Sequence, residues 1–297
     1  MKRKLATSLG LAALALGMSA TAASARTIIF VGNSFLFASH TAVMHYKPDT
    51  VTDLNGTNIG GVPALFKSFT KQVGLDYDVS METVGGKGFD YHYNEKLSVI
   101  TAKSYDDIIL QGYSTLDEKN PGNPALLIKY TKMLGDAMRA KSPSAKIYLD
   151  ATWSRADQTY PEGRPWHGKP IEQMGIDVDK AYQAAAKEAG KSVNGIVTVG
   201  LAFNRAMKTN IADTNPYDGI SANQTNLWTW DNYHASPSGL YLEALMIFGA
   251  VTGKDPLVLG NKEPCAEDLE ISPTLRVALQ QVAHDELMAH GVSIAMK

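Results

Sequence analysis

The sequence predicts an α/β protein built on a five-stranded parallel sheet. Short runs of β-branched and other apolar residues recur along the chain, and each run is followed by a Gly, Asn or Asp that ends it. Most of these runs lead into a segment with helical spacing of its apolar residues. Such an alternation of strand and helix places parallel strands side by side, with helices on both faces of the sheet.

Five segments have the character of buried strands. The first is β-branched and aromatic and stops at Gly32-Asn33, and the second is broken by the glycine-rich stretch 85–88. The five predicted strands cover residues 27–31, 77–84, 107–110, 146–149 and 195–199. Because the carboxyl ends of parallel strands collect at one edge of a sheet, we expect the loops at that edge to carry any ligand site.

Six segments repeat apolar residues at helical spacing. They cover residues 62–73, 126–140, 176–189, 201–208, 237–252 and 274–290. Two other stretches, 47–61 and 154–170, are rich in Pro, Gly, Asp and Asn, so we expect surface loops there. The sequence has no repeat, linker or charge block. We therefore expect residues 26–297 to form a single domain.

The first 25 residues have the features of a bacterial-type secretory signal. Lys2, Arg3 and Lys4 precede an apolar stretch, and Ala23-Ser24-Ala25 offers a small-residue cleavage site. We expect cleavage after Ala25 and a secreted or periplasmic protein. No later segment approaches about 20 uninterrupted apolar residues, so no membrane anchor is expected. The signal holds three of the 28 basic residues and none of the 30 acidic ones, which leaves an acidic remainder without a nucleic-acid footprint.

Two residue types that often carry chemistry give no site in this sequence. Cys265 is the lone cysteine, which excludes an intramolecular disulfide, and we expect it to be an ordinary surface or half-buried thiol. His40, His45 and His92 are scattered among tyrosines without the close pairing typical of a zinc site. We therefore predict no metal and no cofactor.

Two segments far apart in the sequence could supply a nucleophile and its base. Ser34 follows the first strand in TIIFVGNSF, where a hydroxyl can project over the edge of the sheet. Asp231 and His234 lie in WTWDNYHASPSG, where a carboxylate could orient an imidazole that accepts the serine proton. Taken separately, Ser34 is more typical of a helix cap, and the Asp-x-x-His segment is more typical of a capped turn beside a buried histidine.

Together these segments resemble the blocks of the SGNH, or GDSL-type, hydrolase family. GNSF, residues 32–35, corresponds to the nucleophile block of that family, and WDNYH, residues 230–234, corresponds to its closing Asp-x-x-His block. The resemblance covers roughly residues 27–256. It implies a flavodoxin-like three-layer fold and ester hydrolysis through an acyl-enzyme, with Ser34 as nucleophile, His234 as base and Asp231 as the group that orients the base.

The same resemblance implies an oxyanion hole, formed in part by the N–H group of Ser34. The second family block supplies a glycine N–H, and we assign it to Gly86 in VGGKGF, with Gly88 as the alternative. The third family block normally holds an asparagine, which this chain lacks in the corresponding stretch LQGYST. We expect the amide of Gln111 to replace it, whereas a strict alignment on Gly112 selects Ser114.

The loops after the strands also hold aromatic residues that could bind a sugar ring or an acyl group. The candidates for substrate contact are Trp153, Trp230 and Tyr233, although these three, like Trp166 and Trp228, are equally compatible with the core. The sequence thus predicts a serine esterase, with a carbohydrate deacetylase or short-chain acyl esterase as its specific form. The alternatives are an O-acyltransferase that uses the same triad, and a non-catalytic periplasmic carbohydrate-binding protein on this scaffold.

Overall fold

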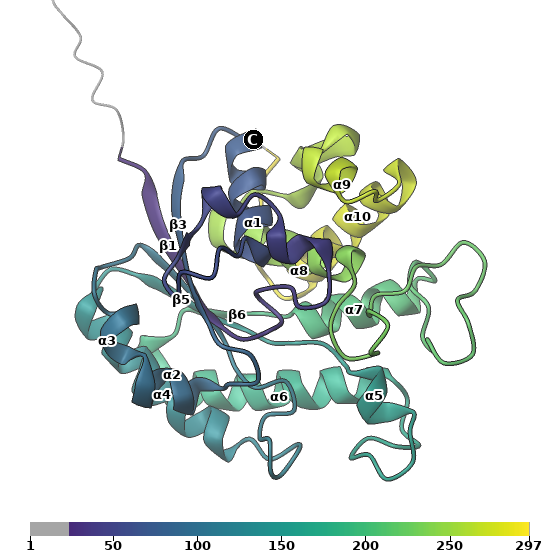
Figure 1. The fold of residues 1–297 in the computed structure, drawn as a ribbon, viewed down its shortest axis with the longest axis horizontal. Helices are drawn as coiled ribbons and strands as arrows, with labels where there is room; N and C mark the ends of the chain where they lie inside the picture. The colour runs from purple at the N-terminus through teal and green to yellow at the C-terminus, as the bar shows by residue number, and fades with distance from the viewer. Residues whose placement is uncertain (1–23, 297) are drawn as a thin grey trace, which may run out of the picture.

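The chain folds around a parallel sheet of six strands, shown in the computed structural model of Figure 1, which describes residues 24–296. The strands are β1 (Arg26–Gly32), β2 (Thr52–Asp53), β3 (Tyr77–Thr83), β4 (Asp107–Gln111), β5 (Lys146–Asp150) and β6 (Gly195–Val197), in the spatial order β2-β3-β1-β4-β5-β6. Every neighbouring pair is parallel. The predicted secretory signal lies outside the described residues, apart from its last two positions.

The predicted α/β fold class is confirmed, but the predicted number of strands is wrong. The additional strand, β2, pairs Thr52 with Ser80 and Asp53 with Met81 at the edge of the sheet. It lies inside the stretch 47–61 that we expected to be a loop. Two residues are too short to show an alternating pattern, so the polar composition around them concealed the strand.

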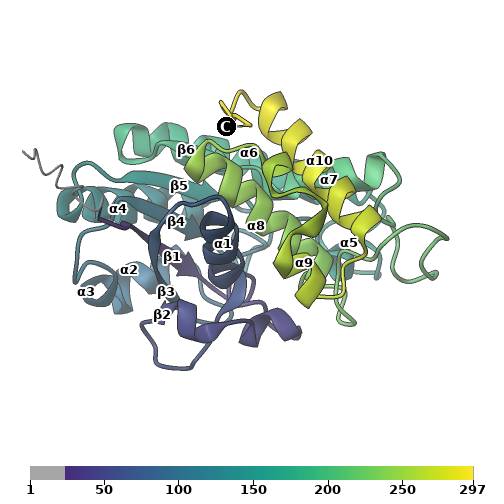
Figure 2. The same ribbon diagram turned by 90° about the horizontal axis from the view of Figure 1, so that it is seen from above.

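Two layers of helices cover the sheet (Figures 1 and 2). One face carries α1 (Gly61–Gln72), α7 (Val199–Lys208), α8 (Pro237–Thr252) and α10 (Pro273–Ala289), and the other carries α2 (Phe89–Glu95), α4 (Ala125–Lys141) and α6 (Glu172–Ala189). Along β1, Ile28 and Phe30 pack into the first core, whereas Ile29 and Val31 pack into the second. The strand is apolar throughout because successive side chains point to opposite faces and both faces are covered.

The six predicted helices are present, and the sequence missed several short ones. These are α3 (Leu97–Ile100), α5 (Ala156–Thr159) and α9 (Pro264–Asp268), besides α2 and the 3₁₀ segments Ala42–His45, Pro48–Thr50, Gly190–Ser192 and Pro256–Lys262. Segments of this length show no helical period in sequence. None of the helices within residues 24–296 is long and apolar enough to cross a membrane.

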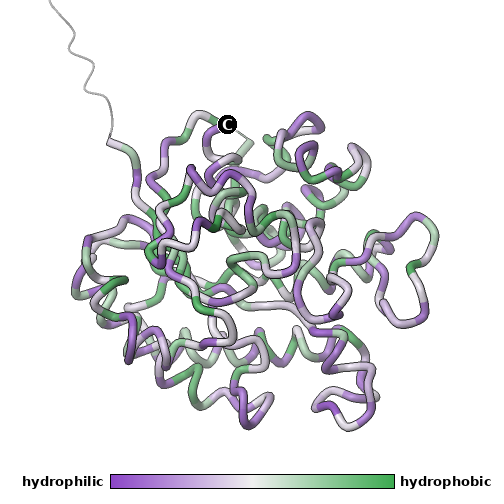
Figure 3. The backbone as a smooth tube through the Cα atoms, viewed as in Figure 1, coloured by the Kyte–Doolittle hydropathy of each residue, from purple (hydrophilic) through white to green (hydrophobic). Residues whose placement is uncertain are grey.

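Helix α8 is buried on almost all sides, between the sheet and the helices around it. In Figure 3 hydrophobic residues are concentrated at the centre of the fold, whereas the outer loops are mainly hydrophilic. Cys265, in α9, is also completely buried, so the expectation of a surface or half-buried thiol is wrong. Burial raises the pKa of this thiol to about 12, which keeps it protonated at neutral pH.

An acidic pair is buried where α8 packs against the sheet. The side-chain amide of Gln111 donates one hydrogen bond to Asp150 (2.7 Å) and a second to Glu243 (2.9 Å), and all three residues are inaccessible to solvent. Burial raises the pKa of Asp150 to about 6, and it raises the pKa of Glu243 well above its ordinary value. Because two adjacent buried carboxylates cannot both ionise at low cost, the pair retains a proton near neutral pH.

Replacing Glu243 by Gln should therefore stabilise the protein increasingly as the pH rises. The unfolded chain releases the proton of this carboxyl at a lower pH than the folded chain does. The free energy of unfolding therefore falls as the pH rises from the unfolded pKa to the raised folded pKa. Glutamine has the same shape and removes this penalty. Urea unfolding at pH 5 and pH 8 should give similar stabilities at pH 5 and a more stable Glu243→Gln variant at pH 8.

The exposed Glu188 of α6 supplies the matched control. Glu188→Gln removes a carboxylate of the same type from the surface and should leave the pH dependence of stability unchanged. If Glu243→Gln changed the free energy of unfolding by the same amount at pH 5 and pH 8, the assignment of a shared buried proton would be contradicted.

Candidate active site

Ser34 lies just beyond β1, at the carboxyl edge of the sheet. The chain leaves the strand at Gly32 and turns back at once, so that the Ser39 N–H donates to the Ser34 carbonyl at 2.9 Å. A Cβ atom on Gly32 would lie 2.7 Å from Leu36 Cδ1 and 3.0 Å from Gln111 Cβ, so any other residue would force these side chains to move. The glycine thus lets the turn pack tightly over β4, and it leaves Ser34 buried, with 7% of its surface exposed.

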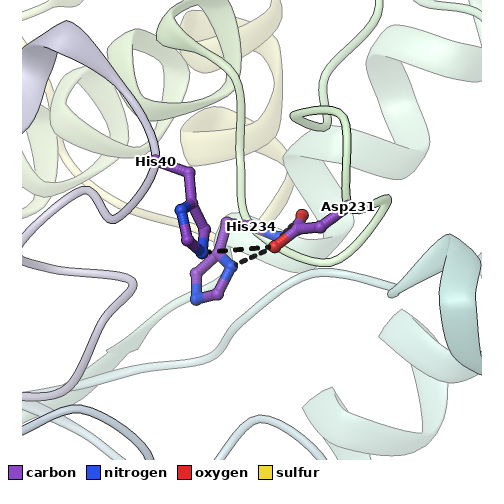
Figure 4. Close-up of side chains that lie close together, drawn as sticks. All are labelled: His40, Asp231 and His234. Atoms are coloured by element: carbon purple, nitrogen blue, oxygen red, sulfur yellow. Dashed lines mark hydrogen bonds and ion pairs between the residues drawn. The ribbon is translucent and has the colours of Figure 1, made fainter.

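Asp231 and His234 lie on a tight loop that leads into α8. One carboxylate oxygen of Asp231, Oδ1, accepts hydrogen bonds from the Thr229 hydroxyl (2.6 Å) and from the backbone N–H groups of Tyr233 (3.0 Å) and His234 (2.9 Å). These bonds close the loop around the carboxylate. The second oxygen, Oδ2, is left to face the imidazole (Figure 4).

The predicted nucleophile, base and orienting carboxylate come together in space. His234 Nδ1 lies 2.6 Å from Asp231 Oδ2, and His234 Nε2 lies 2.9 Å from Ser34 Oγ. Because an ionised carboxylate only accepts hydrogen bonds, the proton of the neutral imidazole lies on Nδ1. Nε2 then has a lone pair directed at the Ser34 hydroxyl, which is the arrangement required for deprotonation of a serine.

The protonation states of Asp231 and His234 suit this arrangement. Burial alone would raise the pKa of Asp231, but the hydrogen bonds donated by Thr229, Tyr233 and His234 lower it to about 2. Burial is also the largest influence on His234 and lowers its pKa below the ordinary 6.5. Asp231 opposes this change, while the nearby His40 and Arg155 add to it. At neutral pH the imidazole is therefore neutral and able to accept a proton.

Gly86 lies one strand away from Ser34. The register of β1 with β3 pairs Gly32 with Thr83, so both chains leave the sheet at the same level. Gly86 has a φ of 68°, is exposed, and has open space where a side chain would be. Among the hydrogen bonds of the described residues, none uses the backbone N–H of Ser34 or of Gly86. Both N–H groups are thus available to a ligand.

The expectation that Gln111 donates to an oxyanion is contradicted by its surroundings. Both N–H bonds of its amide are taken by Asp150 and Glu243, and the side chain is completely buried beneath the edge of the sheet. Gln111 is the last residue of β4, so its side chain points into a helix-covered face. The amide donates to both members of the acidic pair and is not free to donate elsewhere.

Ser114, the alternative for the same position, lies three residues beyond the end of β4. Its hydroxyl accepts a hydrogen bond from Arg155 Nη1 at 3.1 Å, and within residues 24–296 its own proton has no acceptor. Arg155 is itself fixed by Asp157 through two hydrogen bonds of 3.0 and 2.7 Å, and it lies over the Tyr233 ring. The guanidinium thus polarises a hydroxyl that still has a proton to donate.

Asn33, which the sequence analysis treated only as part of a turn, connects three segments. Its side-chain amide donates to the carbonyl of Lys87 (3.1 Å) and to that of Gly112 (2.9 Å), while its side-chain oxygen accepts from the Phe35 N–H (3.2 Å). The loops that follow β1, β3 and β4 are therefore tied together beside Ser34. No feature of GNSF alone indicates these partners, since they lie 54 and 79 residues away.

The three aromatic candidates for substrate contact have different environments. Trp153 is completely buried and stacks between Phe35 and Phe203, with ring centroids at 4.0 and 5.0 Å, so its assignment to substrate is wrong. Trp230 is 77% exposed, and Tyr233 is partly exposed with its ring centroid 4.1 Å from that of His234. Of these three candidates, Trp230 and Tyr233 are the two that can touch a molecule bound at this face.

A cleft of about 400 Å³ opens beside Gly86, between α2 and the segment that follows β4. Both carbonyls held by Asn33, those of Lys87 and Gly112, belong to lining residues, so the cleft adjoins the Ser34 turn. Tyr91 and Tyr113 line it together with charged and amide side chains, among them Asp90, Asn94, Asp117 and Asn120. Its size falls in the range of small-molecule sites, which is about 300–1,000 Å³.

Comparison with known proteins supports the fold. A DUF4886 family protein from Bacteroides uniformis superimposes with a TM-score of 0.61 at 15% identity, over 92% of this chain and 98% of its own. A GDSL-like protein from Parabacteroides merdae gives 0.52 at 15% identity, over 77% and 95% of the two chains. An acetyl xylan esterase gives 0.51 at 14% identity, over 76% and 99%.

The TM-scores above 0.5 show a shared fold, and identities of 14–15% show nothing beyond the fold. The predicted resemblance to the SGNH, or GDSL-type, hydrolases is therefore confirmed as a likeness of fold. No protein-family model matches the chain, and no curated protein matches it in sequence. A shared fold does not imply a shared activity, which depends on the residues of the site.

Asn33→Asp should destabilise the protein, although the nucleophile block of GDSL-type hydrolases has an aspartate at the corresponding position. The two carbonyls that face Asn33 need N–H donors, and a carboxylate would turn oxygen lone pairs towards both. Asn33 is 4% exposed, and each buried polar group left unsatisfied costs about 1–3 kcal/mol. We expect the free energy of unfolding to fall by at least about 2 kcal/mol at pH 7 in urea titrations.

The loss should be smaller at pH 4, where a protonated aspartate can donate one hydrogen bond. Asn94→Asp, at an exposed position on α2, is the control for the added charge. If Asn33→Asp were as stable as that control at pH 7, the Asn33 contacts would not hold the three loops.

Proposed function

We propose that this protein is a serine hydrolase that cleaves carboxylic esters through an acyl-enzyme. The observation that carries the proposal is the continuous chain of contacts from Ser34 Oγ through both nitrogens of His234 to Asp231. Three side chains from segments 200 residues apart meet with the distances and protonation states that nucleophilic catalysis needs. The fold shared with an acetyl xylan esterase agrees with this chemistry.

The reaction begins when the Ser34 oxygen attacks the ester carbonyl and His234 Nε2 takes the hydroxyl proton. Asp231 stabilises the resulting imidazolium through Nδ1. His234 then gives the proton to the departing alcohol oxygen, which leaves an acyl ester on Ser34. In the second half, His234 takes a proton from water, the hydroxide attacks the acyl carbon, and the carboxylic acid departs as Ser34 regains its proton.

Negative charge on the carbonyl oxygen is stabilised by three donors. Two are the unpartnered backbone N–H groups of Ser34 and Gly86, at the ends of neighbouring strands. For the third we propose Ser114, in place of Gln111, because its hydroxyl keeps a free proton while Arg155 donates to its oxygen. A donor fixed before the reaction lowers the barrier because nothing has to reorganise as the charge develops.

The substrate we propose is a short-chain acyl ester, and an acetylated carbohydrate above all. The cleft beside Gly86 is lined by tyrosines and by carboxylate and amide groups, a set that can stack on a sugar ring and hydrogen-bond its hydroxyls. Phe89, Leu116 and Leu127 also line the cleft and supply apolar contacts for the acyl group. Exposed Trp230 beside the site adds a further surface for a sugar.

We also propose that residues 26–297 form one catalytic domain and that the leader directs it out of the cytoplasm. The composition of the first 25 residues supports this, as does the absence of any linker-like segment. A carbohydrate ester substrate would be accessible to a protein released in this way.

The first test is turnover of p-nitrophenyl acetate by the mature protein, together with labelling by a fluorophosphonate. We expect hydrolysis, and one label on Ser34. Ser34→Ala and His234→Ala should each lower kcat by roughly 10⁴-fold or more, because the nucleophile and base act as a unit. Ser39→Ala, five residues further along the same turn, is the matched control and should keep its activity.

Absence of both turnover and labelling would refute the esterase and leave the non-catalytic binding protein on this scaffold. If acetylated sugar formed faster than acetate when a sugar acceptor is present, acyl transfer would replace hydrolysis as the reaction.

The second test concerns the third oxyanion donor. Ser114→Ala should lower kcat by roughly 10²–10³-fold with little change in KM, since the lost hydrogen bond strengthens only as charge develops. Ser98→Ala, at an exposed position on α3, controls for the loss of a serine. An unchanged kcat in a folded Ser114→Ala variant would remove this residue from the oxyanion hole.

A further inference from the structure

A second histidine lies against the proposed triad. His40 Nε2 is 3.8 Å from Asp231 Oδ2, the same oxygen that meets His234 Nδ1 at 2.6 Å (Figure 4). One potential ligand atom from each of these three residues lies within 4.8 Å of the other two. The mechanism proposed above gives His40 no part.

The fold directs His40 to this position. It ends the turn that begins at Ser34, and both Ala38 and His40 adopt left-handed backbone conformations, with φ of 63° and 65°. Such conformations are unfavourable for residues other than glycine and persist only where the surroundings hold them. The imidazole contacts His234 and Trp230 edge to face, with centroid distances of 5.0 and 5.2 Å. Its side chain is 42% exposed, so solvent reaches the cluster.

We propose that His40, Asp231 and His234 bind a divalent transition-metal ion, of which Zn²⁺ is the best fit, and that this binding switches the hydrolase off. Two imidazoles and one carboxylate are a ligand set that zinc prefers. In a tetrahedral site with bonds of about 2.0–2.2 Å, the ligand atoms are about 3.3–3.5 Å apart. The present 2.6 and 3.8 Å need only small side-chain movements, and the exposed side of His40 leaves room for a water as fourth ligand.

The switching part of the proposal rests on the proposed function and follows from the tautomers of imidazole. In the triad the ring proton of His234 is on Nδ1, and Nε2 accepts the Ser34 proton. A metal ion on Nδ1 displaces that proton to solvent, and the neutral ring then carries a proton from solvent on Nε2. The number of protons bound by the ring is unchanged, but Nε2 has lost the lone pair that deprotonates Ser34.

No pattern in the sequence indicates this cluster of His40, Asp231 and His234. Asp231 and His234 are three residues apart, but His40 comes from the other end of the chain, so no pattern of close spacing exists. Two of the three ligands also belong to the proposed triad. The prediction of no metal rested on the spacing of His40, His45 and His92 in sequence, and spacing in sequence does not indicate a group formed by distant segments.

Isothermal titration with ZnCl₂ tests the site directly, on mature protein freed of any polyhistidine tag. We expect one Zn²⁺ per chain, and at least about tenfold weaker binding in His40→Ala, since loss of even an outer-shell partner costs 10–100-fold. Ser34→Ala should bind as the wild type does, because Ser34 is not a ligand. His45→Ala, an exposed histidine five residues along, is the matched control and should also bind normally.

Inhibition is then measured as the ratio of each variant's rates with and without Zn²⁺. The wild type and His45→Ala should be inhibited with the same midpoint, EDTA should restore the rate, and His40→Ala should need at least about tenfold more zinc. Wild-type protein that binds no zinc, or His40→Ala that binds it equally well, would overturn the metal site.

Zinc bound through His40 without any loss of rate would overturn the switch alone. If the wild type neither hydrolyses p-nitrophenyl acetate nor reacts with a fluorophosphonate, the proposed function fails. The titrations would still decide whether the metal site exists, because they do not depend on turnover.

Discussion

The arrangement of the site depends on the side chain of Asn33. A parallel sheet brings the ends of its strands to one edge, but the loops beyond that edge have no ladder hydrogen bonds to fix them. In this chain one buried amide makes three bonds, to Lys87, Gly112 and Phe35, and so ties the loops after β1, β3 and β4 to each other. The positions of Ser34, Gly86 and Ser114 relative to one another follow from these bonds.

A second polar group lies directly beneath this edge and has a purely structural role. Gln111 was the most plausible oxyanion donor on residue type, because an amide in the third family block normally has that role. Here its two N–H bonds satisfy Asp150 and Glu243, two acids that would otherwise be buried side by side with no donor. Residue type and approximate position cannot distinguish a donor that faces the substrate from one that faces the core. That distinction depends on which face of β4 its last side chain occupies.

The sequence therefore predicted the long strands and helices better than it predicted the short elements and the contacts between distant segments. Strands and helices with a long period were located closely, since burial on both faces makes β1 continuously apolar and amphipathic packing gives α4 its spacing. The two residues of β2 and the single turns of α5 and α9 have no period to detect. Ser34, Asp231 and His234 were selected through a family resemblance, because no local pattern indicates that segments 200 residues apart meet.

The aromatic residues illustrate the same limit. Trp153 and Trp230 both follow expected strands or loops and look equivalent in sequence, yet the first is sandwiched between Phe35 and Phe203 while the second is 77% exposed. Which indole is buried is decided by what packs above it, and that depends on contacts distant in sequence. Predictions of site residues from composition thus needed correction wherever the side chain's direction mattered.

The proposed metal site depends on the same properties of His234 that the proposed mechanism requires. A general base must be neutral, held by an ionised carboxylate, and reachable by substrate, and those are also the properties of a good metal-binding imidazole. The exposed neighbouring imidazole of His40 supplies the third ligand of the proposed site. Because Asp231 Oδ2 can serve either the ring proton of His234 or a metal ion, but not both, occupation of the metal site and catalysis by the triad exclude each other. The geometry that prepares this serine for attack is thus also what makes it open to control by a metal ion.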